Sequence, residues 1–593
     1  MLRTLDGPPS PTLATTLRSC DLLAQLDPAA LDAIVAEFEW QFLPADDELY
    51  APGQAPAGMT ILVAGRLDVR DEHHVRLRRI AVGEPVGETS LLTDRVATTS
   101  VRAARDSVLA HLSRPKFEQL ALTHPTVLLA LTRVLADRLR QADAAHAVRD
   151  TSLVVAIAPA SRGVPADAFA RRLAERWPAG QARSLAARDA AAELGPADPA
   201  ADTAHAHLTR WLHAHEQTHA ALLLVADPGD SAWTRFVLRE ADVVLLLADA
   251  TASPDAPISA LHQPAREGAA DRRELVLLHP RHTRAPQGTR RWLTAFPVAA
   301  HHHVRAGDDR DLDRLARGLT GRAHILVLSG GAARSIAHIG VLQALEQANV
   351  PIDLVCGTSM GAVVAGLHAR GRDAEQIRVL MRRHLVEQSI YDLTVPLVSA
   401  VAGRHLDRFM DACFADARIE DLWLPFFCVS SNLGRGVPVI HDSGRVADAV
   451  RCSSAVPGLF PPVKHGDDLL IDGLFLDNMP VAAARRRAAG RVIAVNVISL
   501  ADPGFGAFPE GRGVAQWVRA LNPFAAAWQP PPIVGLVLQA FFLGTMTAAE
   551  QARRDVDLYV EPPVGHIQFL ETAKFDEAVE IGRRTMQARL TAW

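Results

Sequence analysis

The chain has 593 residues, of which 49% are hydrophobic and 22% charged, and this ordinary globular balance excludes a mostly disordered protein. One hydrophobic core rarely extends beyond about 250–300 residues, so the length predicts two or three domains. The 62 Lys and Arg residues are offset by 67 Asp and Glu residues, and a net charge of -5 does not indicate a basic protein built around nucleic acid. The abundance of Ala and Arg and the scarcity of lysine are typical of a GC-rich, bacterial coding sequence.

The cysteines and the apolar segments predict a cytoplasmic protein. The chain contains five cysteines with no C-x-x-C pair, an odd number that suits no disulfide framework: Cys20, Cys356, Cys413, Cys428 and Cys452. The N-terminus, M-L-R-T-L-D-G-P-P-S, has no apolar run, so we expect no signal peptide. The most apolar stretch, Ile533 to Ala549, is slightly short for a membrane span and follows three prolines, which favours a buried or membrane-facing helix.

The first 150 residues predict a small antiparallel β-barrel or jelly roll. Helical spacing of apolar residues from Leu22 to Phe38 is followed by short strand-like runs that turn residues interrupt. Several short strands at this spacing are typical of small closed β-structures. A long helix is expected from about Pro125 to Val148, with an exposed, charged later part.

Residues from about 151 to 318 predict a parallel α/β sheet. Four apolar runs, L-V-V-A-I-A, A-L-L-L-V-A-D, D-V-V-L-L-L-A-D and E-L-V-L-L-H, alternate with helical stretches. The first run is followed by P-A-S-R-G-V-P, which lacks G-x-x-x-x-G-K-[ST], so we predict no P-loop. Two aspartates at strand ends, Asp227 and Asp249, are expected to cap loops or helices, with a site role as the alternative.

Two histidine groups raise the question of a metal site. His205 and His207 form H-A-H, and residues 301–303 are three consecutive histidines beside G-D-D-R-D. Neither group has a carboxylate or a second histidine at fixed helical spacing. We therefore predict a solvated linker at 301–303 and no metal.

The last 275 residues contain two strand–turn–helix patterns. The first runs from a strand at Ile325 to Leu328 into the glycine turn of residues 329–335, which would place backbone N–H groups at a helix N-terminus, a ready anion site. The second runs from I-D-L-V-C into Gly357-Thr358-Ser359-Met360-Gly361 and then a helix. This is G-x-S-x-G between strand and helix, and it predicts Ser359 as a nucleophile.

A nucleophilic serine requires a base. No downstream histidine lies in an evident loop after a buried strand with an acidic partner; the candidates are His368, His384, His405, His441, His465 and His566. Asp472 ends the apolar strand of L-L-I-D-G-L-F-L-D-N-M-P-V, where partial desolvation would raise its basicity. Asp477 in the same run is the competitor, and it could instead pair with the turn before Asn478 and Pro480.

Five motifs in this order resemble the patatin-like phospholipase family, from about Ala323 to the C-terminus. They are the glycine-rich loop of residues 330–335, A-H-I-G-V-L, G-T-S-M-G, C-S-S-A-V-P-G-L-F-P-P at 452–462, and I-D-G…D-N-M-P. The resemblance implies a Ser-Asp dyad of Ser359 and Asp472. It also implies an oxyanion hole at Gly330, Gly331 and Ala332, with Arg334 as the basic residue of that loop.

The chain departs from this family at the oxyanion loop. The usual loop is G-G-G-x-[RK]-G, whereas Ala332 and Ser335 replace the third and last glycines here. A Cβ where φ is positive costs roughly 1 kcal/mol or more. The usual D-G-G or D-G-A is Asp472-Gly473-Leu474. Because the backbone donors survive these changes, we expect activity that is retained but lowered.

The first region resembles the cyclic nucleotide-binding domain. The resemblance lies in V-A-G-R-L-D-V and V-G-E-T-S-L-L-T-D and implies ligand residues at Gly87 and Glu88. Ungapped alignment places Ala97 where the phosphate-binding Arg usually stands, and Arg95 could substitute only if the loop is shortened. Losing that charge-assisted partner costs roughly 1.5–3 kcal/mol, so we predict no tight cyclic nucleotide binding.

The three regions together resemble the neuropathy target esterase type of lysophospholipase. We expect a cyclic nucleotide-binding-like domain at 15–148, an α/β domain without a P-loop at 150–318 and a patatin-like domain at 322–593. The implied function is a serine hydrolase of lysophospholipid or phospholipid esters, without cofactor or metal. The alternative is a regulatory or scaffolding protein with a weakened hydrolase site.

Such a substrate resides in membranes, so we expect a cytoplasmic protein that contacts the inner membrane surface reversibly. The net charge of -5 argues against general attraction to anionic lipid and favours local apolar contact. Trp517, Phe524 and Trp528 suit such an interface, and packing in a core explains them equally well.

Overall fold

The computed structural model describes residues 2–591 except for several segments. The longer exceptions are 6–16, 71–75, 88–96, 133–151, 195–201, 255–260, 262–271 and 499–549, and shorter ones of one to three residues occur elsewhere. The chain forms two compact units. The first comprises Met1–Leu278 and Arg291–His301, and the second comprises His279–Arg290 and His302–Trp593.

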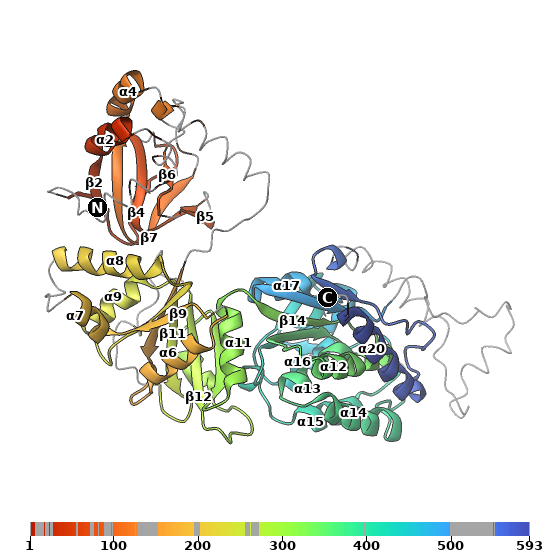
Figure 1. Ribbon diagram of the computed structural model, residues 1–593. Coiled ribbons are helices and arrows are strands. Elements are labelled where there is room, and N and C mark those ends of the chain that lie inside the picture. The colour runs from red at the N-terminus through yellow and green to blue at the C-terminus, as the bar shows by residue number, and fades with distance from the viewer. Residues whose placement is uncertain are drawn as a thin grey trace. The chain divides into compact units, whose positions relative to one another are not determined.

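The first unit begins with a seven-stranded antiparallel sheet in the order β1-β2-β7-β4-β5, where β3 also pairs with β7 and β6 with β4. Its elements are β1 (Arg3–Thr4), α2 (Pro28–Glu37), β2 (Glu39–Leu43), β3 (Glu48–Tyr50), β4 (Gly58–Arg70), β5 (Arg76–Ile80), β6 (Pro85–Val86), β7 (Ser100–Ser113) and α4 (Arg114–Thr123) (Figure 1). The predicted small antiparallel β-structure is therefore confirmed. Most of the helix expected from Pro125 to Val148 lies outside the described residues.

The two longest strands, β4 and β7, build the core of this sheet. Alternate residues face opposite sides of a strand, so Ile61 and Val63 enter one apolar cluster while Leu62 enters another. The pairing of β4 with β7 shifts register near Gly65, which has a φ of 96°. A Cβ on Gly65 would lie 2.3 Å from the carbonyl oxygen of Asp106. This glycine therefore permits the bulges that bend the sheet into a closed shape.

The α/β part has a six-stranded sheet in the order β13-β12-β11-β8-β10-β9. Its elements are β8 (Leu153–Pro159), α6 (Ala166–Glu175), β9 (Ala182–Leu185), α7 (Ala187–Leu194), α8 (Asp202–Glu216), β10 (Ala221–Val225), α9 (Ala232–Glu240), β11 (Val243–Asp249), β12 (Arg273–His279), α10 (Thr289–Ala295), β13 (Ala300–Arg305) and α11 (Asp309–Leu319). Strands β8 to β12 pair in parallel, which confirms the predicted parallel α/β sheet.

The two aspartates at strand ends serve local structure. Asp227 accepts a hydrogen bond of 2.6 Å from the hydroxyl of Ser231, the N-cap of α9. Asp249 accepts bonds of 2.8 and 2.7 Å from the N–H and hydroxyl of Thr251. Both aspartates therefore have the capping role expected from the sequence.

The prediction of a solvated linker at 301–303 is wrong. These histidines belong to β13, and His303 is buried. The two ring nitrogens of His303 lie 2.9 Å from Nε2 of His279 and 3.0 Å from the carbonyl oxygen of Glu420. A satisfied imidazole is tolerated inside a strand, so the polarity of the sequence was misleading here. Within the described ranges, no group of three or more His, Cys, Asp or Glu residues is placed to hold a metal ion.

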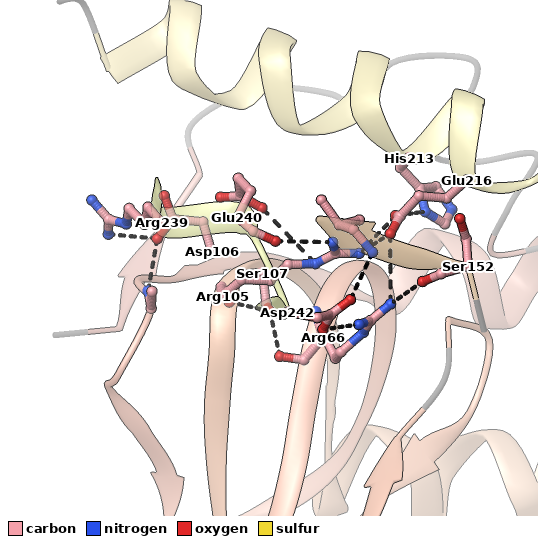
Figure 2. Close-up of polar contacts among 12 residues, drawn as sticks. Arg66, Arg105, Asp106, Ser107, Ser152, His213, Glu216, Arg239, Glu240 and Asp242 are labelled. Atoms are coloured by element: carbon pink, nitrogen blue, oxygen red, sulfur yellow. Dashed lines mark hydrogen bonds and ion pairs between the residues drawn. The ribbon is translucent and has the colours of Figure 1, made fainter. Parts of the chain in front are cut away.

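Within the first unit, buried charges join the β-barrel to the α/β sheet (Figure 2). We call Arg66, Arg105, Glu216, Glu240 and Asp242 the charge cluster. Arg105 of β7 donates to both carboxylate oxygens of Glu216 at 2.5 and 2.6 Å, and Arg66 of β4 pairs with Asp242. Arg66 also donates to the carbonyl oxygen of Ser152 at 2.9 Å. Every acidic member of the cluster comes from the α/β part and both arginines come from the barrel.

The second unit is built on a mixed eight-stranded sheet in the order β18-β19-β16-β15-β14-β20-β21, with β17 paired to β16. Its elements are β14 (Ala323–Leu328), η2 (Ala332–Ile336), α12 (Ala337–Gln347), β15 (Leu354–Thr358), α13 (Met360–Ala369), α14 (Ala374–Arg382), η3 (Arg383–Glu387), α15 (Arg404–Phe414), η4 (Ile419–Asp421), β16 (Phe426–Asn432), β17 (Val437–His441), α16 (Val446–Ser453), β18 (Val463–His465), β19 (Asp468–Asp472), η5 (Gly473–Phe475), α17 (Val481–Arg487), β20 (Gly490–Val495), β21 (Leu558–Val560), η6 (Thr572–Lys574) and α20 (Phe575–Leu590). Strands β14, β15, β16, β20 and β21 pair in parallel, whereas β17 and β19 each pair antiparallel with β16, and β18 pairs antiparallel with β19.

Helices α12 and α20 approach each other at two glycines. A Cβ on Gly340 would lie 1.8 Å from the carbonyl oxygen of Val579, and one on Gly582 would lie 1.9 Å from that of Ala337. Backbone thus meets backbone at both points, and α20 is held against the helix that follows the glycine turn.

No helix in the described part of the chain is both long and apolar enough to cross a membrane. The stretch from Ile533 to Ala549 and the aromatic residues Trp517, Phe524 and Trp528 lie outside the described residues.

Candidate active site

Ser359 occupies a strained turn between strand β15 and helix α13. Its φ of 55° and ψ of -128° are unusual for a residue with a side chain. Gly357 and Gly361 make this turn possible, because a Cβ on Gly357 would lie 2.8 Å from the carbonyl oxygen of Leu328 and one on Gly361 would lie 2.4 Å from that of Ser329. The predicted strand–turn–helix context of G-x-S-x-G is therefore present.

The hydroxyl of Ser359 donates a hydrogen bond of 2.5 Å to Oδ2 of Asp472. Asp472 ends β19, which pairs with β16 so that Asp472 stands opposite Ser430. Strand β16 in turn pairs with β15, the strand that leads to Ser359. The sheet thus brings together two residues that are 113 positions apart, and both are buried.

The environment of Asp472 favours its neutral form. Burial raises the pKa of Asp472 to about 7, and the hydrogen bonds from Ser359 and from the N–H of Leu474 only partly oppose that rise. The Leu474 N–H donates to Oδ1 at 2.9 Å. A carboxylate with a pKa near neutrality is a stronger base than an ordinary aspartate, which suits general-base chemistry at pH 7.

The alternative bases are directed elsewhere. Burial raises the pKa of Asp477 to about 6, while Arg486 and the N–H of Met479 act to lower it. The backbone oxygen of Asp477 accepts from the hydroxyl of Thr358 at 3.0 Å. Among the histidines downstream, Nε2 of His441 lies 2.8 Å from the hydroxyl of Ser430, and His566 pairs with Glu577. Of the candidate bases, Asp472 is the one that the structure places on Ser359.

The glycine turn contributes fewer free amides than the sequence predicted. The N–H of Gly330 donates to Oδ1 of Asn478 at 2.8 Å, so this amide already has a partner, and its predicted oxyanion role stays a prediction. Its glycine identity has another cause: a Cβ there would lie 3.0 Å from Cβ of Ser359. Ala332 has a φ of 49° and begins η2, and amides in a first helical turn have no partner within the helix. Gly331 and Ala332 remain the candidate donors.

Arg334 does not point toward the nucleophile. Its buried guanidinium donates to the carbonyl oxygens of Gly565 and Ile567, each at 2.7 Å, and stacks over the ring of Phe569. The N–H of Ala333 also donates to the carbonyl oxygen of Phe569, at 2.8 Å. Arg334, the basic residue of the loop, therefore links the glycine turn to residues 565–567, because both carbonyl partners hold its guanidinium there.

The sequence motifs contain two residues near Ser359 for which no separate role was predicted. The hydroxyl of Ser453 accepts from the N–H of Ser359 at 2.9 Å and donates to the carbonyl oxygen of Val429 at 2.6 Å. Asn478 holds the glycine turn through Gly330. Their motif positions were visible in the sequence, but which backbone group each side chain would reach depends on strands paired far apart in the chain.

The barrel residues with a possible ligand role are only partly described. Gly87 has a φ of 78°. Glu88 and Arg95 lie outside the described residues. Ala97 exchanges backbone hydrogen bonds of 2.8 and 2.9 Å with Gly53 and Gln54.

A serine on a strained strand-to-helix turn, with a buried aspartate on its hydroxyl, defines a nucleophile-elbow site. Three family models match the chain. Residues 326–485 match the patatin-like phospholipase family, residues 152–324 the neuropathy target esterase family P-loop like domain, and residues 40–124 the cyclic nucleotide-binding domain. The chain thus has the neuropathy target esterase-type architecture that its motifs predicted.

Curated relatives align with most of this chain. A lysophospholipase nte1 of Emericella nidulans is 29% identical over 94% of this chain and 42% of its own length. A lysophospholipase NTE1 of Mycosarcoma maydis is 29% identical over 97% of this chain and 35% of its own length. The chain therefore spans less than half the length of these relatives. They are fungal and do not support the expected bacterial source.

Two solved structures each match about a fifth of the chain. The catabolite activator protein of Thermus thermophilus is 26% identical over 21% of this chain and 60% of its own, with a TM-score of 0.20. The sensor domain of the regulator DNR from Pseudomonas aeruginosa is 18% identical over 23% of this chain and 98% of its own, with a TM-score of 0.20. The assignment of the barrel depends on the family model.

Proposed function

We propose that this chain is a serine hydrolase that cleaves the acyl ester bonds of lysophospholipids or phospholipids. One observation carries the proposal: the 2.5 Å hydrogen bond from the strained Ser359 to the buried Asp472, inside a segment that matches the patatin-like phospholipase family. The names of the curated relatives support the substrate class. We assign domains at 15–148, 150–318 and 322–593.

The proposed mechanism uses only residues of this chain. Asp472 takes the hydroxyl proton as Oγ of Ser359 attacks the acyl carbonyl carbon, and the amides of Gly331 and Ala332 stabilise the oxyanion. Collapse of the tetrahedral intermediate breaks the ester C–O bond, and Asp472 returns its proton to the leaving alcohol. Water, deprotonated by Asp472, then attacks the acyl-enzyme, and breaking the Ser359 ester bond releases the fatty acid.

The test is covalent labelling combined with turnover. A fluorophosphonate probe should label the wild-type chain and the control variant Ser443→Ala, which alters an exposed serine, but not Ser359→Ala. The same three proteins should then be assayed with lysophosphatidylcholine and short-chain esters. Labelling of Ser359→Ala at the wild-type level would show that the nucleophile is another residue.

The second candidate is a regulatory or scaffolding protein with a weakened hydrolase site. The observation in its favour is Ala332, whose φ of 49° strains the oxyanion turn where glycine is usual in the family it resembles. Efficient probe labelling with no turnover of any ester would favour this reading.

We also propose that the barrel does not bind a cyclic nucleotide tightly, since Ala97 stands where the phosphate-binding Arg is expected. Calorimetry of the full chain with cAMP and with cGMP should show no dissociation constant of about 1 μM or below. Tight binding that Arg95→Ala abolishes would assign the neutralising charge to Arg95.

A further inference from the structure

The second unit contains an exposed apolar hairpin between Asp392 and Ala402. The main chain pairs Leu393 with Val401, Thr394 N–H donates to Ala400 O at 3.0 Å, and Ala402 N–H donates to the backbone oxygen of Asp392 at 2.8 Å. The side chains toward its tip are exposed: Leu393 by 49%, Val395 by 73% and Val398 by 70%. Pro396 and Leu397 lie outside the described residues.

The base of this hairpin is fixed by a capping carboxylate. Asp392 accepts hydrogen bonds from the N–H groups of Gly403 and Arg404 at 2.9 and 3.1 Å, at the start of α15. The buried hydroxyl of Ser399 donates to the carbonyl oxygen of Val401 at 2.7 Å. Hydrogen bonds therefore fix the start and end of the hairpin, while Val395 and Val398 between them are exposed. None of these hydrogen bonds requires an apolar side chain at either position.

The hairpin is tied to the segment that contacts the dyad. The N–H groups of Ala400 and Val401 donate to the carbonyl oxygens of Gly458 and Leu459 at 2.9 and 3.0 Å. A few residues earlier in that segment, Ala455 O accepts from the N–H of Asp472 at 3.0 Å. The segment therefore connects the hairpin base to the nucleophile and its base through short, direct bonds.

A second exposed apolar pair lies beside the end of β16. Leu433 and Leu469 are exposed, and the N–H of Leu433 donates to the carbonyl oxygen of Leu469 at 2.9 Å. Both lie about 10 Å beyond the pairing of Ser430 with Asp472, at a strand rise of about 3.3 Å per residue. This is the carboxyl end of β16, and the parallel strand β15 enters Ser359 at its own carboxyl end.

We propose that these five side chains, the apolar rim (Leu393, Val395, Val398, Leu433 and Leu469), dock onto the surface of the lipid aggregate that contains the substrate. Single exposed apolar residues are common, but here they lie on two segments that are each linked by backbone bonds to the surroundings of Asp472. The rim is entirely aliphatic, which suits insertion among acyl chains. The side chain of Arg404 at the hairpin base pairs with Asp392 at 3.4 Å and is still 80% exposed, so its remaining donors face solvent and can contact phosphate headgroups. The inference rests on the proposed function.

The experiment compares vesicle binding with catalysis in the full chain. Wild type should sediment with phosphatidylcholine vesicles, and Val395→Asp/Val398→Asp should bind at least about tenfold more weakly, because charges resist burial among acyl chains. Leu122→Asp, which alters an exposed leucine of α4, is the matched control and should bind normally. For the hairpin variant, KM for micellar lysophosphatidylcholine should rise while kcat for a soluble short-chain ester stays unchanged.

The outcomes separate this inference from the proposed function. The docking proposal is wrong if neither the hairpin variant nor Leu433→Asp/Leu469→Asp weakens vesicle binding. It is also wrong if the wild type does not bind vesicles and instead binds a protein partner through these residues. Hydrolysis of soluble esters would survive either result. If the aspartate variant does not fold, Val395→Ser/Val398→Ser with an unchanged melting temperature must reproduce the loss. Ser359→Ala should bind vesicles like wild type, so the docking proposal can be tested even if the chain proves to have no hydrolase activity.

Discussion

The molecule buries carboxylates in two ways that can be compared directly. In the charge cluster of the first unit, Arg66 and Arg105 meet Glu216 and Asp242 in buried ion pairs. In the second unit, Asp472 is equally buried and meets a serine hydroxyl and a backbone N–H. One arrangement compensates negative charge with positive charge, and the other leaves it to two neutral donors.

The difference appears in the acidity of the groups. Burial alone would raise the pKa of Glu216, yet Arg105, His213 and Arg66 together hold it below its usual value. Burial raises the pKa of Asp472 to about 7, with no cation to reverse the effect. A buried carboxylate hydrogen-bonded to arginine therefore keeps its charge and links two parts of the fold, whereas one beside a hydroxyl has the raised pKa that suits the proposed base.

Glu240 lies between these two cases. It is buried beside Arg105, whose Nε is 3.9 Å away, but neither of its carboxylate oxygens has a hydrogen-bond partner. Burial raises the pKa of Glu240 to about 8 although Arg105 lowers it. Proximity to a guanidinium is therefore not enough, and direct hydrogen bonds decide whether the charge is kept.

Removing either member of the dyad should have the largest effect. We expect Ser359→Ala and Asp472→Asn each to lower kcat/KM by about 10³-fold or more, and the double variant to be no worse than either single one because the two act as a unit. Thermal unfolding should show that both variants fold. Full activity in Asp472→Asn would mean that a histidine is the base.

Breaking the charge cluster should affect stability and spare the chemistry. Arg105→Leu removes both hydrogen bonds to Glu216 and leaves this buried carboxylate with the more distant guanidinium of Arg66, 3.6 Å away, so we expect a loss of up to about 3–5 kcal/mol in unfolding free energy. Arg105→Leu/Glu216→Leu should recover part of that loss, since no uncompensated charge remains on Glu216. Denaturant unfolding measures both. An unchanged midpoint in Arg105→Leu would show that the cluster does not hold the barrel to the α/β sheet.

The pH profile tests the acidity of Asp472. The base must be deprotonated, and deprotonation occurs above a pKa of about 7, so kcat/KM for a soluble ester should rise roughly tenfold between pH 6 and pH 8. An ordinary aspartate with a pKa near 3.9 would give a flat profile over that range. A flat profile together with an inactive Asp472→Asn would show that the carboxyl is acidic in the working enzyme.

The smallest expected effect concerns the strained turn at Ala332. Ala332→Gly removes a Cβ from a position with a φ of 49°, so it should stabilise the fold by at most about 1 kcal/mol and raise kcat a few-fold. A stopped assay on a soluble ester is sensitive enough. A fall in activity would show that the strain helps to position the oxyanion donors.

Local sequence patterns predicted the elements well and their partners less well. The G-x-S-x-G turn depends on a few neighbouring residues, and its strand and helix lie where the pattern placed them. Arg334 was assigned to the oxyanion loop from its position in the sequence. Its guanidinium donates hydrogen bonds to the carbonyl oxygens of Gly565 and Ile567, more than 230 residues away. No pattern near Arg334 could indicate that segment.

The polarity of a residue was misleading where its side-chain hydrogen bonds offset the cost of burying it. His303 belongs to a strand because its two ring nitrogens find partners in His279 and Glu420. Gly330 was expected to serve the oxyanion, and Asn478 occupies its N–H instead. Both cases concern a polar group whose partner comes from a distant part of the sequence.

The close contacts at Gly340 and Gly582 between α12 and α20 connect α20 to the turn beside Ser359. Any side chain at Gly340 or Gly582 would wedge the helices apart by the width of a methyl group. The carbonyls of residues 565–569 that hold Arg334 and Ala333 precede α20 by only a few residues, so the wedge would reach the turn beside Ser359. A change that strains α20 should therefore disturb the turn beside Ser359 from a distance.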